Sequence, residues 1–406
     1  MEGIAHISLT DAKRLSRYLL KTGDIVYSRR GDVERRALIT ERENGWLCGT
    51  GCLRVRFGEG IVAPQFASYF LSHPASREWV VRHAVGATMP NLNTSILGAL
   101  PFLLPSLPEQ RTIASVLGAL DDKIESNRRT SRTLERMARA IFRAWFVDFG
   151  PVKAKAAGAR SFPSMAQEAF DALPSRLVES ELGPVPEGWG VGCIGDLVSV
   201  RGGGTPSTKV EEYWEGGTHC WLTPKDLSGV KDPILLSTDR KITDKGLDKI
   251  SSGLLPVGTI LLSSRAPVGY LVISRVPTAI NQGFIAMVCD GPLPPLYVFH
   301  WTQSVMDEIK SRASGTTFPE ISKTAFRPIK VCVPTTPVLE SFTAAVEPLF
   351  DKIAANISES QSLERLRDYL LPRLLSGEVR VQLGLLPKPV ADKGGIQSNE
   401  GAGNAQ

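Results

Sequence analysis

Residues 117–124 read LGALDDKI, and residues 346–353 read VEPLFDKI, 229 positions later in the chain. The triplet Leu-Glu-Arg follows both octets at the same offset, as residues 134–136 and 363–365. Agreement at one fixed offset over separate stretches is typical of an internal repeat. The chain is therefore predicted to contain two related half-units.

The repeat extends upstream of the octets. The further pairs at the offset of 229 are Gly86 with Gly315, Thr88 with Thr317, Pro90 with Pro319, Leu92 with Ile321, Pro105 with Pro334 and Pro108 with Pro337. Still further upstream the offset becomes 235, which aligns residues 23–25 with 258–260 and Arg30 with Arg265. The duplication is thus predicted to include both a globular part and a long helix.

Each half-unit shows the same succession of expected elements. A β-rich stretch of alternating apolar residues comes first, at residues 20–58 and 193–290. A short helical pattern follows, and then a Thr/Pro loop, a short strand and a long helix. The helical patterns cover residues 66–84 and 297–312, and the short strands cover residues 99–104 and 329–333.

The long helices have heptad spacing. The first seam runs through positions 113, 117, 120, 124, 127, 131, 134, 138, 141 and 145, and the second through 342, 346, 349, 353, 356, 360 and 363. Such a narrow seam requires a partner helix, so the two helices are expected to pack together. Packing of each helix on its own domain is the alternative. A helix from Pro108 to Val147 would be roughly 60 Å long, more than a small domain needs.

Chain connectivity predicts the direction of this packing. The first helix must lead to the second globular domain and the second helix must return, so we expect an antiparallel pair. The predicted spacer core includes Leu120, Ile124, Asn127, Leu349, Ile353 and Asn356. A polar residue in a coiled-coil core fixes the register at a cost in stability. We therefore hypothesise that Asn127 and Asn356 face each other near the midpoint of the pair.

The two half-units are expected to be unequal. The second begins near Leu182, and 182 minus 235 is −53, so the first is expected to lack roughly fifty residues of its globular part. The block without a counterpart runs from Leu182 to about Ser237. It contains RGGGTPS at residues 201–207 and WLTPKD at residues 221–226.

Composition is that of an ordinary globular protein of several domains: 406 residues, 42% of them hydrophobic. There is no apolar run of 18 residues and no signal-peptide pattern, so we expect a cytoplasmic protein without a membrane span. Six cysteines and five histidines are scattered along the chain, which predicts reduced thiols and no metal site. The net charge of +5 is too small to indicate nucleic-acid binding by itself.

The chain contains no convincing catalytic motif. An adenine methyltransferase would carry an Asn/Asp-Pro-Pro-aromatic motif, but Asp232-Pro233 is followed by Ile234. A phosphate-binding Gly-x-x-x-x-Gly-Lys-Ser/Thr loop is also absent. Residues 308–310, Glu-Ile-Lys, imitate the end of a nuclease motif, but no Pro-Asp pair precedes them, and a surface charge pair explains them better. We expect no catalytic residue.

Four stretches resemble the specificity subunits of type I restriction–modification systems. LPSLPEQRTIA at residues 104–114 and LDDKIE at 120–125 are similar to the start of that family's central spacer. LGPVPEGW at 182–189 looks like the opening of its second target-recognition domain, and RDYLLPRLLSGE at 367–378 looks like its closing spacer motif. The resemblance covers roughly residues 20–380, and the four stretches together are specific.

The resemblance implies an α+β fold, in which two target-recognition domains, each a mixed β-sheet with short helices, are separated by two long antiparallel coiled-coil spacer helices. The expected segments are a partial first domain (1–105), the central spacer (106–150), a connector (151–181), the second domain (182–335), the C-terminal spacer (336–380) and a disordered tail (381–406). The shortened first domain departs from the family's pattern, which puts the first half-site reading in doubt.

The resemblance also implies the chemistry and the partners. Each domain would read half of a split target in double-stranded DNA, and the chain would dock two modification subunits that carry S-adenosylmethionine and methylate adenine. Restriction subunits would add translocation and cleavage driven by ATP with Mg. The chain itself would hold no cofactor and would not be an enzyme. A self-sufficient nuclease or methyltransferase, or a degraded copy that only assembles with partners, is the alternative.

Candidate DNA contacts are polar and basic residues on loops beside glycines, because such side chains can reach phosphates and base edges. In the first domain they are Arg29, Arg30, Thr88 and Asn91. In the second domain they are Thr205, Ser207, Lys209, Lys225, Arg265, Asn281, Gln282, Thr316 and Thr317. The repeat relates Arg30 to Arg265 and Thr88 to Thr317, so each of these two positions is a candidate in both half-units. Ordinary loop polarity is the alternative for each residue.

Overall fold

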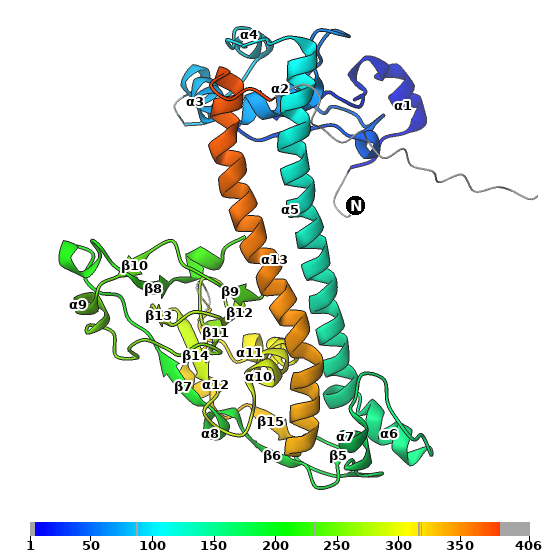
Figure 1. Cartoon of the computed structure of the whole chain (residues 1–406), viewed down its shortest axis with the longest axis vertical. Coiled ribbons are helices and arrows are strands. Elements are labelled where there is room, and N and C mark those ends of the chain that lie inside the picture. Colours follow the sequence, from blue (N-terminus) through cyan, green and yellow to red (C-terminus); the bar gives the residue numbers. More distant parts are fainter. Residues whose placement is uncertain (1–4, 87, 230–231, 316, 318, 382–406) are drawn as a thin grey trace, which may run out of the picture. The chain divides into compact units, whose positions relative to one another are not determined.

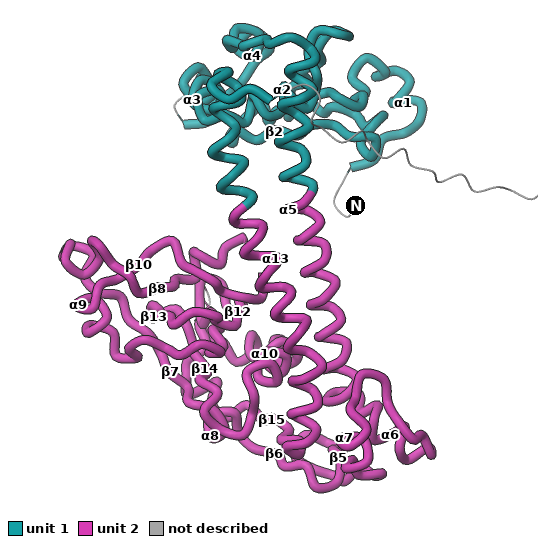
Figure 2. The backbone as a smooth tube through the Cα atoms, in the orientation of Figure 1, with its two compact units in different colours: residues 1–122, 363–406 teal, residues 123–362 magenta. Residues whose placement is uncertain are grey.

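The computed structural model describes residues 5–86, 88–229, 232–315, 317 and 319–381 (Figure 1). The chain forms two compact units, unit 1 from residues 1–122 and 363–406 and unit 2 from residues 123–362 (Figure 2). Both units combine helices with β-sheet, so the expected α+β class is confirmed. None of the helices in the described part of the chain has the length and hydropathy needed to cross a membrane. The tail predicted to be disordered lies outside the described residues, apart from Val381.

Two long helices contribute residues to both units. Helix α5 runs from Leu107 to Phe142 and continues as a π-helical turn over Arg143–Val147, and α13 runs from Thr336 to Ser376. Ser106 begins α5 in the manner of a capping box, because its hydroxyl and its backbone N–H both donate to the Glu109 carboxylate, at 2.8 and 3.2 Å. The predicted long helices are thus present, each within a few residues of its expected bounds.

The helices are antiparallel within each unit. In unit 1 the beginning of α5 (Ile113) shares a core with the end of α13 (Leu374). In unit 2 the end of α5 (Ala138) shares a core with the beginning of α13 (Val346). Positions 117, 124, 131, 138 and 145 are all buried, as the heptad seam predicts.

Unit 2 is built around a five-stranded sheet in the order β7–β14–β11–β12–β9. The bounds are Ser199–Gly202 for β7, Phe284–Val288 for β14, Ile260–Ser263 for β11, Leu271–Ser274 for β12 and Ile234–Leu235 for β9. Neighbours are antiparallel except β12 and β9. Ile260 faces the core shared with the long helices, whereas Leu261 faces a second core on the other side of the sheet. Burial of both faces explains the unbroken apolar run of β11.

Smaller sheets and short helices complete unit 2. Strands β10 (Lys241–Ile242), β8 (His219–Leu222) and β13 (Thr278–Ile280) form one sheet, β15 (Lys330–Val333) pairs with β6 (Gly190–Cys193), and β4 (Leu177–Val178) pairs with β5 (Val185–Pro186). The helices include α6 (Gly150–Ala156), α7 (Gln167–Asp171), α10 (Pro295–Ser304) and α11 (Met306–Ser311). The expected connector therefore carries two short helices, and its Val152 and Phe170 are buried in the core of this unit.

Unit 1 has a three-stranded antiparallel sheet in the order β2–β1–β3. The bounds are Arg36–Leu38 for β2, Ile25–Ser28 for β1 and Cys52–Val55 for β3, and the helices are α1 (Leu9–Arg14), α2 (Pro64–Ser72), α3 (Pro74–His83) and α4 (Thr94–Gly98). Pro64 and Pro74 each occupy the first turn of a helix, where the missing N–H costs nothing. The predicted single helix over residues 66–84 is therefore two helices.

The repeat is confirmed by strand register. Ile25 of β1 lies opposite Leu38 of β2, and Ile260 of β11 lies opposite Ile273 of β12, so both partners shift by 235 positions. On its other side β1 pairs with β3 just as β11 pairs with β14. The same three-stranded motif is therefore built twice.

The prediction of a strand at residues 99–104 is wrong. The equivalent β15 of unit 2 pairs with β6, but no described residue of unit 1 forms a strand corresponding to β6. Without a partner strand, and with Pro101 unable to donate a backbone hydrogen bond, this stretch stays irregular. Leu103 is 61% exposed, whereas Cys332 at the equivalent position is 8% exposed.

Candidate nucleic-acid interface

Strand register in unit 2 brings several loops to one end of its sheets. Gly202 at the end of β7 lies opposite Ile285, and Ser263 at the end of β11 lies opposite Phe284, so both strands end beside the start of β14. The parallel strands β8 and β13 also end side by side, at Leu222 and Ile280. Since β13 leads into β14 after three residues, the loops that follow all four strands meet at this edge.

A glycine allows the first of these loops to approach β13. The Gly204 N–H donates to the Ile280 carbonyl at 2.9 Å, and a Cβ on Gly203 would lie only 1.9 Å from that carbonyl oxygen. Only glycine can therefore occupy position 203 without moving the backbone. The approach places Thr205 beside the next loop, where its Oγ1 donates to the Gln282 Oε1 at 2.7 Å.

The second and third loops interlock around Gly283. The Asn281 N–H donates to the Leu222 carbonyl at 3.0 Å, and the Asn281 Oδ1 accepts from the Gly283 N–H at 2.8 Å. A Cβ on Gly283 would lie 2.8 Å from Cγ of Pro224. Lys225, the next residue after Pro224, is exposed beside this contact. The side-chain oxygen of Asn281 thus stabilises the turn, and its amide nitrogen can contact another group.

Ser264 links the remaining loops through its backbone. Its N–H donates to the Gly283 carbonyl at 2.8 Å, and its carbonyl accepts from the Ile321 N–H at 3.0 Å. Arg265 follows, and its Nη1 lies 3.6 Å from Oε2 of Glu320. The structure therefore brings five predicted residues into one continuous cluster, which consists of Thr205, Lys225, Arg265, Asn281 and Gln282.

The other predicted residues of unit 2 lie at the margin of this cluster. Ser207 and Lys209 are exposed further along the loop that follows β7, and the Ser207 carbonyl accepts from Nε1 of Trp214 at 3.1 Å. Thr317 is exposed on the loop closed by the pairing of Ser314 with Glu320. Thr316 lies outside the described residues.

Unit 1 contains a smaller version of the same arrangement. The Arg29 carbonyl accepts from the Leu92 N–H at 2.9 Å, in the way that the Ser264 carbonyl accepts from Ile321. Arg30 forms a bridge with Asn91, and Asn91 also pairs with Val85 to close the loop that carries the exposed Thr88. All four predicted residues of this unit therefore lie together. Nε of Arg29 is buried without a hydrogen-bond partner among the described residues.

Glu320 is the residue of this cluster that the sequence reasoning missed. It contacts Arg265, yet it was not among the candidates because they were chosen as basic or neutral polar residues beside glycines. The offset of 229 relates it to Asn91, which was a candidate, so the repeat itself contained the signal.

The predicted asparagines of the spacer lie against each other in unit 2. Nδ2 of Asn127 is 3.5 Å from the Asn356 carbonyl and donates to Oε2 of Glu359 at 2.8 Å. Nδ2 of Asn356 donates to Oγ of Ser131 at 3.3 Å. The two amides thus bond to neighbours on the opposite helix rather than to each other. Among the other spacer-core residues, Ile124 and Ile353 are buried, and Leu120 and Leu349 are partly buried.

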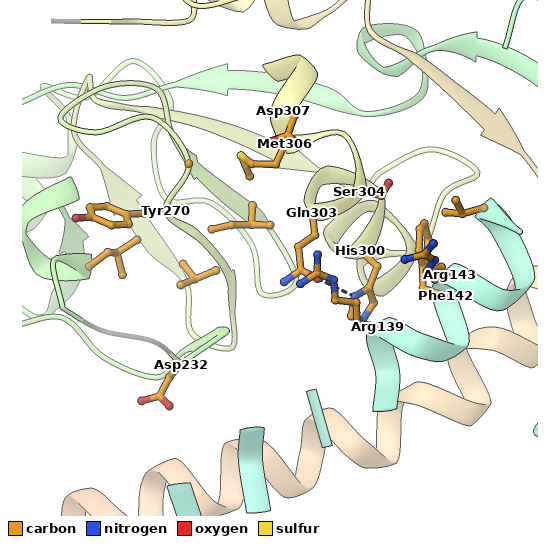
Figure 3. Close-up of a pocket in the computed structure, with 15 residues that line it drawn as sticks. Arg139, Phe142, Arg143, Asp232, Tyr270, His300, Gln303, Ser304, Met306 and Asp307 are labelled. Atoms are coloured by element: carbon orange, nitrogen blue, oxygen red, sulfur yellow. Dashed lines mark hydrogen bonds between the residues drawn. The ribbon is translucent and has the colours of Figure 1, made fainter. Parts of the chain in front are cut away.

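A cleft of about 610 Å³ opens elsewhere on unit 2, between α5, α10 and β12 (Figure 3). His300 lines it, and Nδ1 of His300 lies 3.1 Å from Oε1 of Gln303. Burial lowers the pKa of His300 to about 4, so the imidazole is neutral near pH 7. Its ring packs against Phe142, Phe299 and Phe350, which makes it a core residue. Across the described part of the chain, no three His, Cys, Asp or Glu side chains group so as to hold a metal ion.

Comparisons with known proteins agree with the resemblance seen in the sequence. The sequence model of a family described as "Type I restriction modification DNA specificity domain" matches residues 4–136 and 186–364. The chain is 26% identical over 420 residues to the type I restriction enzyme HindI specificity subunit of Haemophilus influenzae, an alignment that covers 92% of this chain and 91% of that protein. It is 35% identical over 201 residues to the MjaIX specificity subunit of Methanocaldococcus jannaschii, which covers 48% of this chain and 46% of the relative.

The fold is also similar to a solved structure. The crystal structure of a type I restriction–modification S subunit from M. genitalium superposes with a TM-score of 0.54 at 17% sequence identity. The match covers 88% of this chain and 84% of that one. At this identity the likeness concerns the fold alone.

Proposed function

Because this chain belongs to the family of type I restriction–modification DNA specificity domains, we propose that it is the sequence-recognition subunit of such a system. It reads a bipartite target in double-stranded DNA, one half with each unit. It is not itself an enzyme. Its partners carry out catalysis. They are two modification subunits that bind S-adenosylmethionine, and restriction subunits that use ATP and Mg.

One observation carries this proposal: the same arginine-bearing loop occurs at the end of the central strand in both units. Arg30 follows β1 and Arg265 follows β11, and in each unit a second loop is tied to the residue before the arginine by a backbone hydrogen bond. Arginines on loops at one edge of a sheet can reach phosphates and guanine edges. Two such sites on one chain suit a target in two parts.

The boundaries given above follow from the same proposal. The recognition domains are residues 1–105 and 182–335, the spacer helices lie in 106–150 and 336–380, and 151–181 and 381–406 are connector and tail. All thirteen candidate DNA contacts belong to the two recognition domains. The cytoplasm, where the host's DNA is methylated, is the proposed location.

Methylome sequencing of a host that carries the gene with its modification genes tests the proposal. We expect methylated adenines in one bipartite sequence, and we expect them to disappear when this gene alone is deleted. An unchanged methylome would refute the proposal. Incubation of the purified chain with S-adenosylmethionine and DNA is the second arm. Methyl transfer without partners would show a self-sufficient enzyme instead.

A further inference from the structure

The loops around Arg30 and Arg265 are built alike in their backbones. Each arginine is followed by a residue with left-handed backbone, Gly31 at φ 73° and Ala266 at φ 57°. In each unit the loop opposite the arginine begins with a glycine of positive φ, Gly86 at 110° and Gly315 at 106°. The two arginines therefore occupy equivalent positions in loops with similar backbones.

The residue opposite the arginine differs in charge between the two units. Asn91 is bridged to Arg30, whereas Glu320 occupies the equivalent position and its carboxylate lies 3.6 Å from the Arg265 guanidinium. Both side chains of the Arg265–Glu320 pair are partly exposed, at 37% and 46%. The pair therefore faces solvent on the same edge as Thr205 and Gln282, where a ligand can reach it.

The Glu320 carboxylate indicates whether Arg265 contacts a phosphate or a base edge. Beside a phosphate, Glu320 would repel the ligand that Arg265 attracts. Beside base edges it would not, because the major-groove edge of a G·C pair offers two acceptors on guanine, which suit arginine, and an amino donor on cytosine, which suits a carboxylate. An ion pair also restricts the guanidinium before binding, so that less side-chain freedom is lost in the complex.

We infer that Glu320 is a positioning residue that holds Arg265 for a guanine in the second half of the DNA target. The inference rests on the proposed function and deepens it. Arg30, opposite a neutral amide, has no such constraint from position 91. The two half-sites are thus read by equivalent arginines, of which only Arg265 is held by a neighbouring carboxylate.

The test uses the full chain assembled with its modification subunits and a library of DNA fragments with randomised half-sites. Selection by the wild type is expected to show a guanine preference at one position of the second half-site. Glu320→Gln keeps the size of the side chain and removes its charge, so this preference is expected to fall about tenfold. The first half-site is expected to stay unchanged. The salt dependence of binding is expected to steepen, because an arginine without its carboxylate is available to phosphates.

Two further variants distinguish a positioning role of Glu320 from a purely structural one. Arg265→Lys keeps the charge but cannot bind guanine with two parallel hydrogen bonds, so it is expected to lose the same base preference. Glu308→Gln is the matched control, because it removes a Glu–Arg pair with Arg312 on the surface helix α11. It is expected to change neither the base preference nor the salt dependence.

Three outcomes would contradict the inference or the proposed function. Identical base preferences for Glu320→Gln and the wild type would overturn the inference, and so would a uniform loss of affinity for all sequences. If the wild-type complex selects no sequence at all, the proposed function fails before this inference is reached.

Discussion

The central strands of the two units pair in the same register but are buried to different extents. All four residues of β11 are buried, whereas β1 alternates between buried and partly exposed residues. Strand β14 beside β11 is fully buried and pairs with β7, but no strand in the described part of unit 1 pairs with the outer side of β3. The loops after β1 and β11 that we propose for recognition therefore rest on sheets of unequal size, so the two units are expected to respond differently to the same kind of change.

Acid should remove a contribution that His300 makes to the stability of unit 2. The pKa of His300 is about 4 in the folded protein and 6.5 without burial, so the unfolded chain takes up the proton first. Stability present above pH 6.5 is lost as the pH falls toward 4, by an amount on the order of 3 kcal/mol. Tyr69 of unit 1 is the sixth residue of α2, as His300 is the sixth residue of α10. Burial raises the pKa of the Tyr69 phenol, so this residue stays neutral throughout the range.

Equilibrium unfolding at pH 7 and at pH 4.5 measures this difference. His300→Gln is expected to lose less stability between the two values than the wild type loses. Equal losses in both proteins would show that His300 does not cause the acid sensitivity of unit 2.

Gly203→Ala should damage a contact between the loop after β7 and β13, two strands without a counterpart in the described part of unit 1. The new Cβ would lie 1.9 Å from a backbone oxygen, so the loop must move, at a cost of about 1–3 kcal/mol in the free energy of unfolding. Selection at the second half-site should be lost and the first retained. Gly204→Ala is the control, because the nearest atom to its Cβ is 3.9 Å away. Equal effects of the two changes, measured by unfolding and by half-site selection, would contradict the close contact at Gly203.

Replacing the two equivalent arginines should give different patterns of loss. Arg265→Ala is expected to weaken DNA binding by about 1 kcal/mol or more and to relax one base of the second half-site. Arg30→Ala is expected to act on the first half-site alone. Titration at fixed salt against targets mutated in one half at a time measures both. No change in affinity for Arg265→Ala would remove this residue from the candidate contacts.

The smallest effect is expected in the helix pair. In unit 1 Leu117 and Leu371 share a core, and Asp121 and Arg367 form a partly exposed ion pair between the helices. In unit 2 the pair contains the buried Asn127, which donates to Glu359. Asn127→Ala should lower the free energy of unfolding by about 0.5–1 kcal/mol, because it removes a hydrogen bond to a partly exposed carboxylate. Ser126→Ala, on the exposed side of α5, should have almost no effect. A larger loss for Ser126→Ala than for Asn127→Ala in denaturant titrations would exclude a stabilising role for the amide.

The repeat allowed much of the fold to be predicted, because two offsets fix which strands and helices correspond. The strand expected at residues 99–104 failed because strand formation depends on a partner, which local alternation does not reveal. The helices α6 and α7 were missed because they are only seven and five residues long and are stabilised by burial of Val152 and Phe170 in unit 2. The clustering of Thr205 with Gln282 depends on the close approach at Gly203, which no pattern around either residue indicates.

The hydrogen bond that ties the opposite loop to each proposed recognition loop has a consequence for how this chain can change. The hydrogen bond from the opposite loop is accepted by the backbone of Arg29 in one unit and of Ser264 in the other. Since the carbonyl makes the link, this hydrogen bond forms whether the residue is Arg29 or Ser264. New target sequences can therefore evolve by substitution within the loops while the framework that presents them is inherited intact.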